Sequence, residues 1–322
     1  MSILITGGAG FIGSHLIELL LRESVGLPIV CLDNFNDYYD PRSKRANIRP
    51  FANHPAVTVV EQDLCDREAM TRLLAEHRVQ YVVHLAAYAG VHASVQCPWI
   101  YEQVNVGGTL ALLEAARHVP VQRFLLISSS TVYGLGADMP FREDGKMGIP
   151  ASPYGATKRA AELLGLTYWT RFQVPVVCLR PFSVYGPRVR PDLAMAIFTD
   201  RMARGETVHL YGDGTIQRDF THVRDICAGL KSALTAPHVE GEEINLGFGS
   251  PVSMTEVLGL LERQLGVSAT IEYHPGRGED LPVTFASVDK AKRLLNYRPG
   301  VSIAEGVADY CEWYRTHAST SS

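Results

Sequence analysis

A glycine-rich turn near the start of the chain limits the possible folds more than any other feature. Gly7, Gly10 and Gly13 follow the apolar run Ser2–Thr6 in the segment ILITGGAGFIGSHL, and a helical pattern begins beside them. Glycine permits a tight turn, lets backbone N–H groups and a helix N-terminus approach a pyrophosphate, and lets the helix pack close to the strand. The G-x-x-G-x-x-G spacing at a strand-to-helix junction therefore predicts a dinucleotide site; an ordinary strand-to-helix turn is the alternative.

An acidic residue ends the second predicted strand, Ile29–Asp33, twenty residues after Gly13. A carboxylate at this position hydrogen-bonds the ribose diol of a dinucleotide and repels a 2′-phosphate. No arginine follows Asp33 directly, so NAD is favoured over NADP. A capping role for this carboxylate is the alternative. Asp63 and residues 85–87 end further predicted strands at the same edge of the sheet, where ligands bind.

Short apolar runs alternate with longer helical patterns through the first half of the chain. Such runs are typical of strands that are buried on both faces of a parallel sheet. The spacing of Val106, Leu110 and Leu113, together with the segment 156–172, predicts long helices before the fifth and sixth strands, and such helices can also form a dimer face. We predict a doubly wound Rossmann-type α/β fold. Its strands are expected at Ser2–Thr6, Ile29–Asp33, Val57–Val60, Tyr81–Leu85, Arg123–Ser128 and Val176–Arg180.

The composition of the sequence changes after Arg180, where Gly, Pro and Arg become frequent in connecting segments such as GPRVRPD and HPGRGED. Capping boxes at Ser253–Glu256 and Ser302–Glu305 predict two helix starts. These features predict an NAD-binding domain over residues 1–180 and a smaller α/β substrate-binding lobe over residues 181–322. The chain of a doubly wound enzyme can cross between lobes, so the two parts need not fold independently.

Composition argues against several other classes of protein. The 322 residues include 30 basic and 34 acidic side chains, which gives no reason to expect a nucleic-acid or membrane partner. The six cysteines stand far apart, without a C-x-x-C pair or a nearby histidine cluster, so neither a metal site nor a disulfide framework is expected. With no signal peptide and no long apolar run, the sequence predicts a cytoplasmic protein.

A second group of residues indicates acid–base chemistry on a hydroxyl group. The fifth predicted strand ends in LLISSSTVYG, and Tyr154 follows Ser129 by 25 residues. Lys158 shares a helical face with Tyr154, so its ammonium should stabilise the phenolate and pull the pKa from about 10 toward neutrality. Tyr154 would then serve as a base, with Ser129 hydrogen-bonded to the same substrate oxygen and Lys158 to a cofactor ribose. Such a pair on a solvated helix, without function, is the alternative.

These motifs in this order resemble those of an extended short-chain dehydrogenase/reductase of the nucleotide-sugar epimerase branch. The resemblance rests on TGGAGFIG, Asp33, HLAA, SSSTVYG, the pair Tyr154 and Lys158, and RDFTHVRD. The segment LDNFNDYYDPRSKRANI is particularly similar to UDP-glucuronate 4-epimerases. The similarity extends from Ile3 to about Tyr310, and it implies an NAD lobe, a nucleotide-sugar lobe and a homodimer formed through a helical bundle.

The resemblance also implies roles for individual residues. It makes Tyr154, Lys158 and Ser129 catalytic, and residues 208–212 resemble the uracil-binding strand. The implied cofactor contacts are Gly7, Gly10, Phe11, Ile12, Gly13, Asp33, Asn34, Asp63, Leu64, Leu85, Ala86, Ala87, Asn105, Tyr154 and Lys158. The implied substrate contacts are Ser94, Ser129, Ser130, Thr131, Tyr154, Ser183, Arg190, Arg218, Arg277 and Asp280.

The implied reaction is 4-epimerisation of a UDP-sugar. Tyr154 would take the proton of the 4-hydroxyl while NAD accepts the C4 hydride, and the 4-keto sugar would rotate before hydride returns to its opposite face. Related 4,6-dehydratases carry an Asp-Glu pair near the catalytic serine, and decarboxylases carry a glutamate. Ser130 and Thr131 stand there in this chain, which disfavours both of those reactions.

The expected substrate is UDP-glucuronate, because the resemblance puts Ser183 and Arg190 near C6 of the sugar, and a guanidinium suits a carboxylate. A 4-keto uronate loses carbon dioxide when its carboxylate bond aligns with the ketone, and the side chains of Ser129, Ser130, Ser183 and Arg190 could hold the carboxylate out of that alignment. The chain departs from the family in having His92 where many members have an arginine. UDP-glucose/UDP-galactose epimerisation is therefore the alternative, and a non-catalytic NAD-binding sensor is a third reading.

Overall fold

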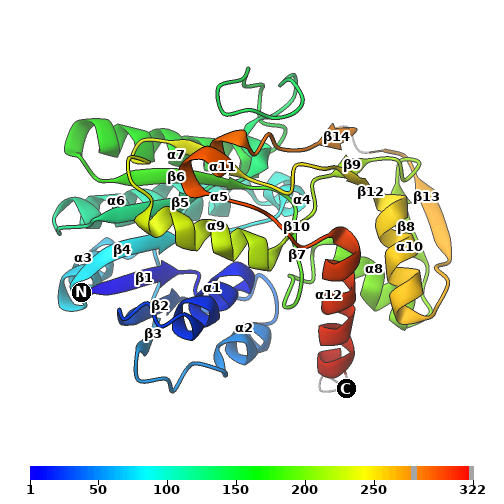
Figure 1. Ribbon diagram of the computed structural model, residues 1–322, viewed down its shortest axis with the longest axis horizontal. Coiled ribbons are helices and arrows are strands. Elements are labelled where there is room, and N and C mark those ends of the chain that lie inside the picture. The colour runs from blue at the N-terminus through cyan, green and yellow to red at the C-terminus, as the bar shows by residue number, and fades with distance from the viewer. Residues whose placement is uncertain (277–280, 319–322) are drawn as a thin grey trace.

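A parallel sheet of seven strands forms the centre of the molecule (Figure 1). The structure is a computed structural model, which describes residues 1–276 and 281–318. The strands are β1 (Ser2–Thr6), β2 (Ile29–Asp33), β3 (Val57–Glu61), β4 (Val79–His84), β5 (Arg123–Ile127), β6 (Val176–Pro181) and β11 (Glu243–Leu246). Their order is β11-β6-β5-β4-β1-β2-β3, and every pairing is parallel. The doubly wound Rossmann-type fold predicted from the sequence is confirmed.

All six predicted strands are present: β1 and β2 have the predicted bounds, and the ends of the other four differ from the prediction by at most two residues. The largest difference is in β4, which runs from Val79 to His84 instead of from Tyr81 to Leu85. The seventh strand, β11, was not predicted. It pairs with β6, with Glu243 opposite Cys178. The chain therefore returns from residues 181–322 to the central sheet, as the sequence analysis allowed.

Helices cover both faces of the sheet, which explains why its strands are apolar throughout. Leu4, Val82 and Leu126 belong to the core on one face, under α3 (Arg67–Glu76), α6 (Thr109–Arg117) and α7 (Pro153–Phe172). Ile5 and Leu125 point to the opposite face, because successive side chains of a strand alternate. They belong to the core beneath α1 (Phe11–Arg22) and α9 (Val223–Thr235), which pack against each other.

The two predicted long helices are present, with local differences. The first is continuous over α5 (Pro98–Tyr101), the π-helical segment η1 (Glu102–Gly108) and α6. The second, α7, begins at Pro153 because Ser152 caps it and accepts the N–H of Gly155 at 3.2 Å. A serine cap followed by proline at the first helical position is a strong helix start.

The second lobe consists of short strands and three main helices, at the right of Figure 1. Ser302 and Glu305 form a reciprocal capping box, since each side chain accepts the other's backbone N–H. At the other predicted box, Ser253 accepts the N–H of Glu256 at 3.1 Å. The elements are β7 (Val184–Tyr185), α8 (Ala194–Ala203), β8 (Val208–Tyr211), β9 (Gln217–Arg218), β10 (Thr221–His222), β12 (Val252–Ser253), α10 (Met254–Leu265), β13 (Ile271–His274), β14 (Val283–Thr284) and α12 (Ile303–Ala318).

Four further helical elements complete the chain: α2 (Pro41–Ile48), α4 (Val91–Gln96), η2 (Ser130–Val132) and α11 (Asp289–Leu295). Within the described residues, none of the helices combines the length and the apolar character needed to cross a bilayer.

A buried ion pair ties α7 to the sheet. Arg180 on β6 is 2% exposed, and its guanidinium donates to both carboxylate oxygens of Glu162 on α7, at 2.8 and 2.9 Å. It also contacts Glu243 on β11 at 2.8 Å and the hydroxyl of Tyr133 at 3.1 Å. Removing one partner of such a pair leaves an uncompensated buried charge, so the pair strongly favours one position of α7. Glu162 lies one turn after Lys158, and the position of that lysine is thereby set as well.

Candidate active site

A large cavity of about 980 Å³ lies beyond the carboxyl ends of β1, β2, β4 and β5 and extends into the second lobe. In doubly wound sheets ligands bind at this edge, where the strand order reverses. The predicted site residues that line the cavity are Gly7, Gly10, Phe11, Ile12, Gly13, Asp33, Asn34, Asp63, Leu64, Leu85, Ala86, Ala87, Ser129, Ser130, Thr131, Tyr154, Lys158, Ser183, Arg190 and Arg218.

The glycine turn brings three stretches of backbone together with no room for side chains. A Cβ at Gly13 would lie 2.3 Å from the carbonyl oxygen of Gly7, and one at Gly7 would lie 2.8 Å from the nitrogen of Ala86. Gly7 also has a φ of +68°, which favours glycine. Helix α1 begins at Phe11, and Gly10 before it provides no side-chain cap. Its first N–H groups therefore suit a diphosphate, and the turn fits a dinucleotide cofactor.

Asp33 is held at the end of β2 by two hydrogen bonds. Its Oδ1 accepts the N–H of Phe35 at 2.9 Å and the ammonium of Lys44 at 3.3 Å, and both charged side chains are buried. Lys44 also donates to Asn36 at 3.0 Å. The sequence analysis missed this lysine, which comes from α2. Because Lys44 is engaged by Asp33 and Asn36, the carboxylate is oriented for a ribose diol, as expected for NAD.

A second carboxylate, Asp63, follows β3 at the same edge. Its oxygens accept the N–H of Cys65 at 2.7 Å and the side-chain amide of Asn34 at 3.1 Å. Partial burial opposes ionisation, but these hydrogen bonds outweigh it and lower the pKa of Asp63. The carboxylate is therefore ionised at neutral pH and able to accept hydrogen bonds.

A buried histidine network supports the segment that follows β4. His84 lies between the hydroxyls of Thr6 and Thr109, at 2.8 and 2.9 Å, and the hydroxyl of Thr6 accepts the N–H of Ala86 at 3.1 Å. Burial, and then the charge of Lys158, lower the pKa of His84 to about 3. The imidazole is thus neutral and links the two hydroxyls, which holds Ala86 against the glycine turn.

Two predicted contact residues lie behind the cavity wall and do not line it. Asn105, in the π-helical segment η1, bonds the backbone N–H and C=O of Tyr88 at 2.8 and 3.0 Å and the hydroxyl of Thr157 at 3.2 Å. Ser94 is completely buried, and its hydroxyl donates to the C=O of Val91. Both side chains satisfy backbone groups, so they position the cavity wall.

Tyr154 and Lys158 face the cavity from the first two turns of α7. The ammonium of Lys158 donates to the C=O of Ile127 at 2.8 Å, and burial lowers its pKa to about 8 although Glu162 opposes this. Burial raises the pKa of Tyr154, with the charge of Arg190 and the hydroxyl of Ser129 acting in the opposite direction. The sequence analysis expected Lys158 to bring this pKa toward neutrality. That expectation is corrected here, because burial dominates and the opposing cation is Arg190.

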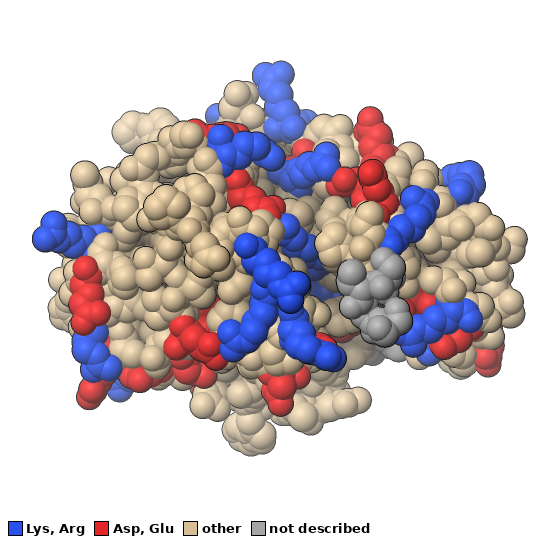
Figure 2. All heavy atoms as spheres, turned by 90° about the horizontal axis from the view of Figure 1, so that it is seen from below, with Lys and Arg blue, Asp and Glu red and all other residues tan. Residues whose placement is uncertain are grey.

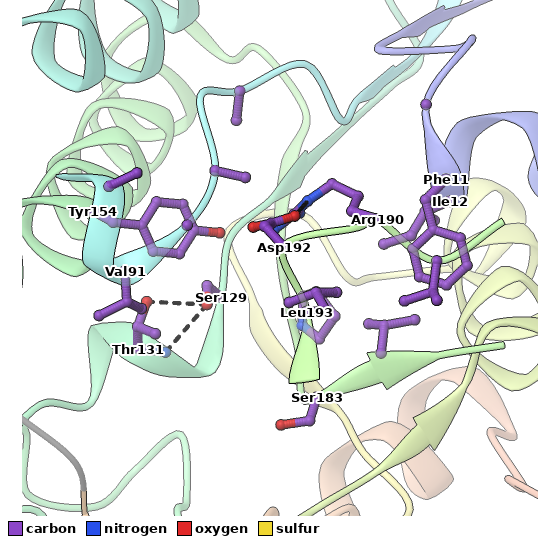
Figure 3. Close-up of a pocket in the computed structure, with 18 of the residues that line it drawn as sticks. Phe11, Ile12, Val91, Ser129, Thr131, Tyr154, Ser183, Arg190, Asp192 and Leu193 are labelled. Carbon is purple, nitrogen blue, oxygen red and sulfur yellow. Dashed lines mark hydrogen bonds and ion pairs between the residues drawn. The ribbon is translucent and has the colours of Figure 1, made fainter. Parts of the chain in front are cut away.

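The hydroxyls beside Tyr154 come from the end of β5. The Oγ of Ser129 accepts the N–H and the hydroxyl of Thr131, at 3.2 and 3.0 Å (Figure 3). The side chain of Tyr154 points into the same space (Figure 3). No carboxylate comes from the 129–131 segment, so that segment offers hydrogen bonds without an additional acid or base.

Arg190 reaches the same space from the loop before α8, and it is paired. Its Nε and Nη2 donate to the two oxygens of Asp192, both at 2.9 Å (Figure 3). The hydroxyl of Tyr38 also donates to Asp192, at 3.1 Å. Burial alone would favour neutral groups, but the pairing raises the pKa of Arg190 and lowers that of Asp192. Neither Asp192 nor Tyr38 was predicted from the sequence. Asp192 could have been suspected from its position two residues after Arg190, but Tyr38 has no such local signal.

The far end of the cavity is lined by Arg218, together with His209 and Tyr211 of β8. Arg218 donates to the backbone carbonyls of Gln217 and Leu281, at 2.9 and 2.7 Å. The predicted contacts Arg277 and Asp280 lie outside the described residues.

The positive charge around the cavity is concentrated in a small part of the surface and is not spread over the whole molecule. Figure 2 shows basic side chains gathered around a recess in the middle of one face, with acidic side chains close by. The chain as a whole has a net charge of −4. An anionic ligand would therefore be bound by a few placed cations and not by a broadly basic surface.

Comparison with known proteins agrees with this geometry. Residues 3–247 match the NAD dependent epimerase/dehydratase family. A UDP-glucuronate 4-epimerase of Thermodesulfobacterium geofontis is 38% identical over 96% of this chain and 95% of its own length. The UDP-glucuronic acid 4-epimerase of Bacillus cereus, in complex with UDP-glucuronic acid and NAD, superposes with a TM-score of 0.93 at 35% identity over 98% of this chain and 99% of that chain. The UDP-glucose 4-epimerase of Thermotoga maritima, solved with UDP-glucose, superposes with a TM-score of 0.90 at 32% identity over 99% of this chain and 100% of that chain.

Burial of Lys158 makes the stability of the fold depend on pH. The pKa is about 8 in the folded chain and stays near 10.5 in the unfolded chain, so the unfolded chain binds more protons between these values. We expect the free energy of unfolding of the wild type, relative to Lys158→Met, to rise by about 2 kcal/mol from pH 7 to pH 10. Urea titrations at each pH measure the difference. The exposed control Lys292→Met should show no such trend, and parallel curves for both variants would contradict the assignment.

Proposed function

The chain belongs to the NAD dependent epimerase/dehydratase family, and from this membership we propose that it is an NAD-dependent 4-epimerase of a UDP-sugar, interconverting UDP-glucuronate and UDP-galacturonate. The observation that carries the proposal is that Tyr154, Ser129 and Arg190 meet in one cavity that also contains the glycine turn and Arg218. The relatives named above support it, because two are UDP-glucuronate 4-epimerases and one of these binds UDP-glucuronic acid and NAD.

The residues around the glycine turn fit NAD. The N-terminus of α1 would hold the diphosphate, Asp33 the adenosine ribose, and Lys158 the ribose of the nicotinamide half. When bound, NAD supplies an acceptor for the hydride of C4 and gives it back to the same carbon. The cofactor is regenerated in each cycle, so turnover needs no second redox substrate.

Tyr154 moves the proton in this mechanism. Its phenolate takes the proton of the 4-hydroxyl, the sugar becomes a 4-ketone, and the same proton returns to the oxygen when the carbonyl is reduced. Ser129 hydrogen-bonds that oxygen in both directions. Burial raises the pKa of Tyr154, so the phenolate depends on the positive charge of Arg190 and on the hydrogen bond from Ser129, both of which lower that pKa.

Inversion requires the ketone to present its other face. Arg218 would hold the diphosphate while the sugar turns about the flexible bonds to the phosphate, and the cavity of about 980 Å³ leaves room for this movement. Ser130 and Thr131 offer no acid or base for removing water, so the ketone is returned to the alcohol.

Arg190 would recognise the carboxylate at C6. Its Nε and Nη2 are taken by Asp192, so the remaining nitrogen, Nη1, is the one that a substrate carboxylate would meet. A hydrogen bond to a charged group contributes about 1.5–3 kcal/mol. UDP-glucose and UDP-galactose are the second candidate substrates, because Asp192 offsets the charge of Arg190 and His92 lines the cavity in place of the expected arginine.

The first test of the function is epimerisation without added cofactor. We expect purified protein to invert C4 of UDP-glucuronate, followed by NMR, over many turnovers and without release of carbon dioxide. Tyr154→Phe should lower kcat by about 10²–10⁴-fold, because the proton acceptor is lost. Tyr273→Phe, an exposed tyrosine on β13, serves as the control. A wild-type rate in Tyr154→Phe would contradict the mechanism.

Substrate choice is tested at Arg190. We expect Arg190→Ala to lower kcat/KM for UDP-glucuronate by about 10–100-fold and to affect UDP-glucose much less. The double variant Arg190→Ala/Asp192→Ala separates this effect from that of the unpaired Asp192. Arg188→Ala is the matched control, because Arg188 is bound by Glu18 at 2.7 Å on the α1 side. An unchanged ratio between the two substrates would overturn the carboxylate assignment.

The protein would act as a homodimer in the cytoplasm. Trp99, Leu163 and Leu110 are 83%, 60% and 37% exposed on the neighbouring segments α5, α7 and α6. A second copy that packs on this face would cover them and make a four-helix bundle. A cytoplasmic location is supported by the six cysteines, all of which are free thiols.

We expect the double variant Leu110→Glu/Leu163→Glu to be monomeric, because the charges would be buried in the bundle. Sedimentation equilibrium should give about twice the chain mass of 35.4 kDa for the wild type and one chain mass for the variant. Val267→Glu, which adds a charge at another exposed apolar residue, should remain dimeric. A monomeric wild type would contradict the homodimer.

A further inference from the structure

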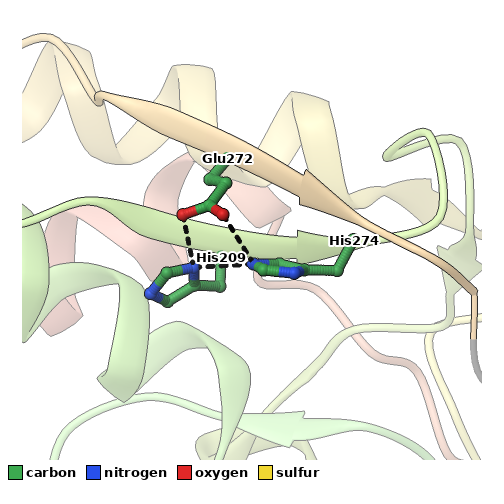
Figure 4. A group of neighbouring side chains, drawn as sticks. All are labelled: His209, Glu272 and His274. Carbon is green, nitrogen blue, oxygen red and sulfur yellow. Dashed lines mark hydrogen bonds and ion pairs between the residues drawn. The ribbon is translucent and has the colours of Figure 1, made fainter.

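Two histidines and a glutamate meet on the ribbon formed by β8 and β13 (Figure 4). The strands are parallel, with His209 directly opposite Glu272. His274 follows Glu272 by two residues on β13, and residues two apart in a strand lie on the same face. The three side chains therefore converge although His209 is 65 residues from His274 in the chain.

The three ligand atoms lie close enough to share one ion. His209 Nδ1 is 2.8 Å from His274 Nε2 and 3.4 Å from an oxygen of Glu272, and His274 Nε2 is 3.7 Å from the other oxygen. Two donors at Zn²⁺ bond lengths and a tetrahedral angle are about 3.3 Å apart. The observed separations lie on both sides of this value, so small side-chain rotations would give a three-coordinate metal site.

We propose that His209, Glu272 and His274 bind a divalent transition-metal ion of the Zn²⁺ type. Two imidazoles and one carboxylate suit Zn²⁺ and its neighbours in the first transition row. Mg²⁺ and Ca²⁺ prefer oxygen ligands throughout. Within residues 1–276 and 281–318 this is the one group of three potential ligands that meets in this way.

The ribbon holds the ligands in place while leaving access for an ion. The N–H of Gly212 donates to the C=O of His274 at 2.9 Å, and the ring of Tyr211 lies 5.5 Å from that of His274. The side chains of His209, Glu272 and His274 are 34%, 57% and 32% exposed. With three protein ligands, a tetrahedral ion keeps a fourth position for water.

The three ligands take no part in the proposed proton transfer, and the metal site stands whether or not the epimerase assignment is correct. His209 and Tyr211 also line the far end of the large cavity, so the ion would sit where that cavity ends. The sequence analysis expected no metal, because it considered cysteine spacing and local histidine clusters. A site assembled across two strands has no such local signature.

Metal binding to the full-length, tag-free and metal-stripped chain tests the proposal. Equilibrium dialysis should give one Zn²⁺ per chain, in competition with Co²⁺ and unaffected by excess Mg²⁺. We expect His274→Gln to weaken binding by more than about 100-fold, because loss of a ligand exceeds the effect of losing a supporting hydrogen bond. Bound Co²⁺ should show the visible bands of nitrogen and oxygen coordination without a thiolate charge-transfer band.

Two matched variants separate this site from others on the chain. His54→Gln removes an exposed histidine outside the cluster, and Cys97→Ser removes an exposed thiol. Both should bind the ion like the wild type, and circular dichroism should confirm that His274→Gln remains folded. The proposal is overturned if the wild type binds no ion, if folded His274→Gln binds like the wild type, or if Cys97→Ser abolishes binding.

Discussion

The close contact between the backbone of Gly7 and that of Gly13 is the constraint on which the rest of the structure depends. A Cβ at Gly13 would lie 2.3 Å from the carbonyl oxygen of Gly7, so helix α1 can begin against the end of β1 only because residue 13 lacks a side chain. Gly7 in turn lies against Ala86 after β4. This contact sets the distance between helix α1 and the paired strands β1 and β4. The carboxyl ends of the neighbouring strands lie around it. Asp33, Ser129 and Tyr154 reach one cavity because the elements that carry them are arranged about this point.

The fold could be predicted from the sequence wherever local pattern and burial agree. Strands buried on both faces are continuous apolar runs, and for that reason the six runs were recognisable with ends correct to one or two residues. Strand β11 was missed because it has only four residues and its position depends on pairing with β6. The two strands are far apart in the chain: Arg180 on β6 and its partner Glu243 on β11 are separated by 63 residues. The π-helical turn around Asn105 was missed for a similar reason, since its hydrogen bonds to Tyr88 and Thr157 come from other elements. Family resemblance, which is confirmed, supplied what local pattern could not.

The site could be predicted in part. The glycine turn, Asp33 and the pair Tyr154 and Lys158 carry fixed spacings, and the structure brings them to one cavity. Their partners carry none. Tyr38 reaches Asp192 across 154 residues, and Lys44 reaches Asp33, at the end of β2, from helix α2. Protonation was the harder quantity, because the pKa of a group follows its burial and all neighbouring charges, which spacing on one helix cannot supply.

The buried charges also explain why Tyr154 would act as a base only when the oxidised cofactor is bound. Burial raises the pKa of Tyr154 and lowers that of Lys158, so each group is pushed toward its neutral form. A phenolate base needs the opposite. Arg190 offers one compensating charge, but Asp192 binds two of its nitrogens and offsets that charge. Further positive charge would come from the bound oxidised cofactor, whereas an anionic substrate at Nη1 of Arg190 would offset the charge of that arginine further. The pKa of Tyr154 is therefore coupled to the charge of the bound cofactor, so the phenolate would be favoured when the oxidised cofactor is in place.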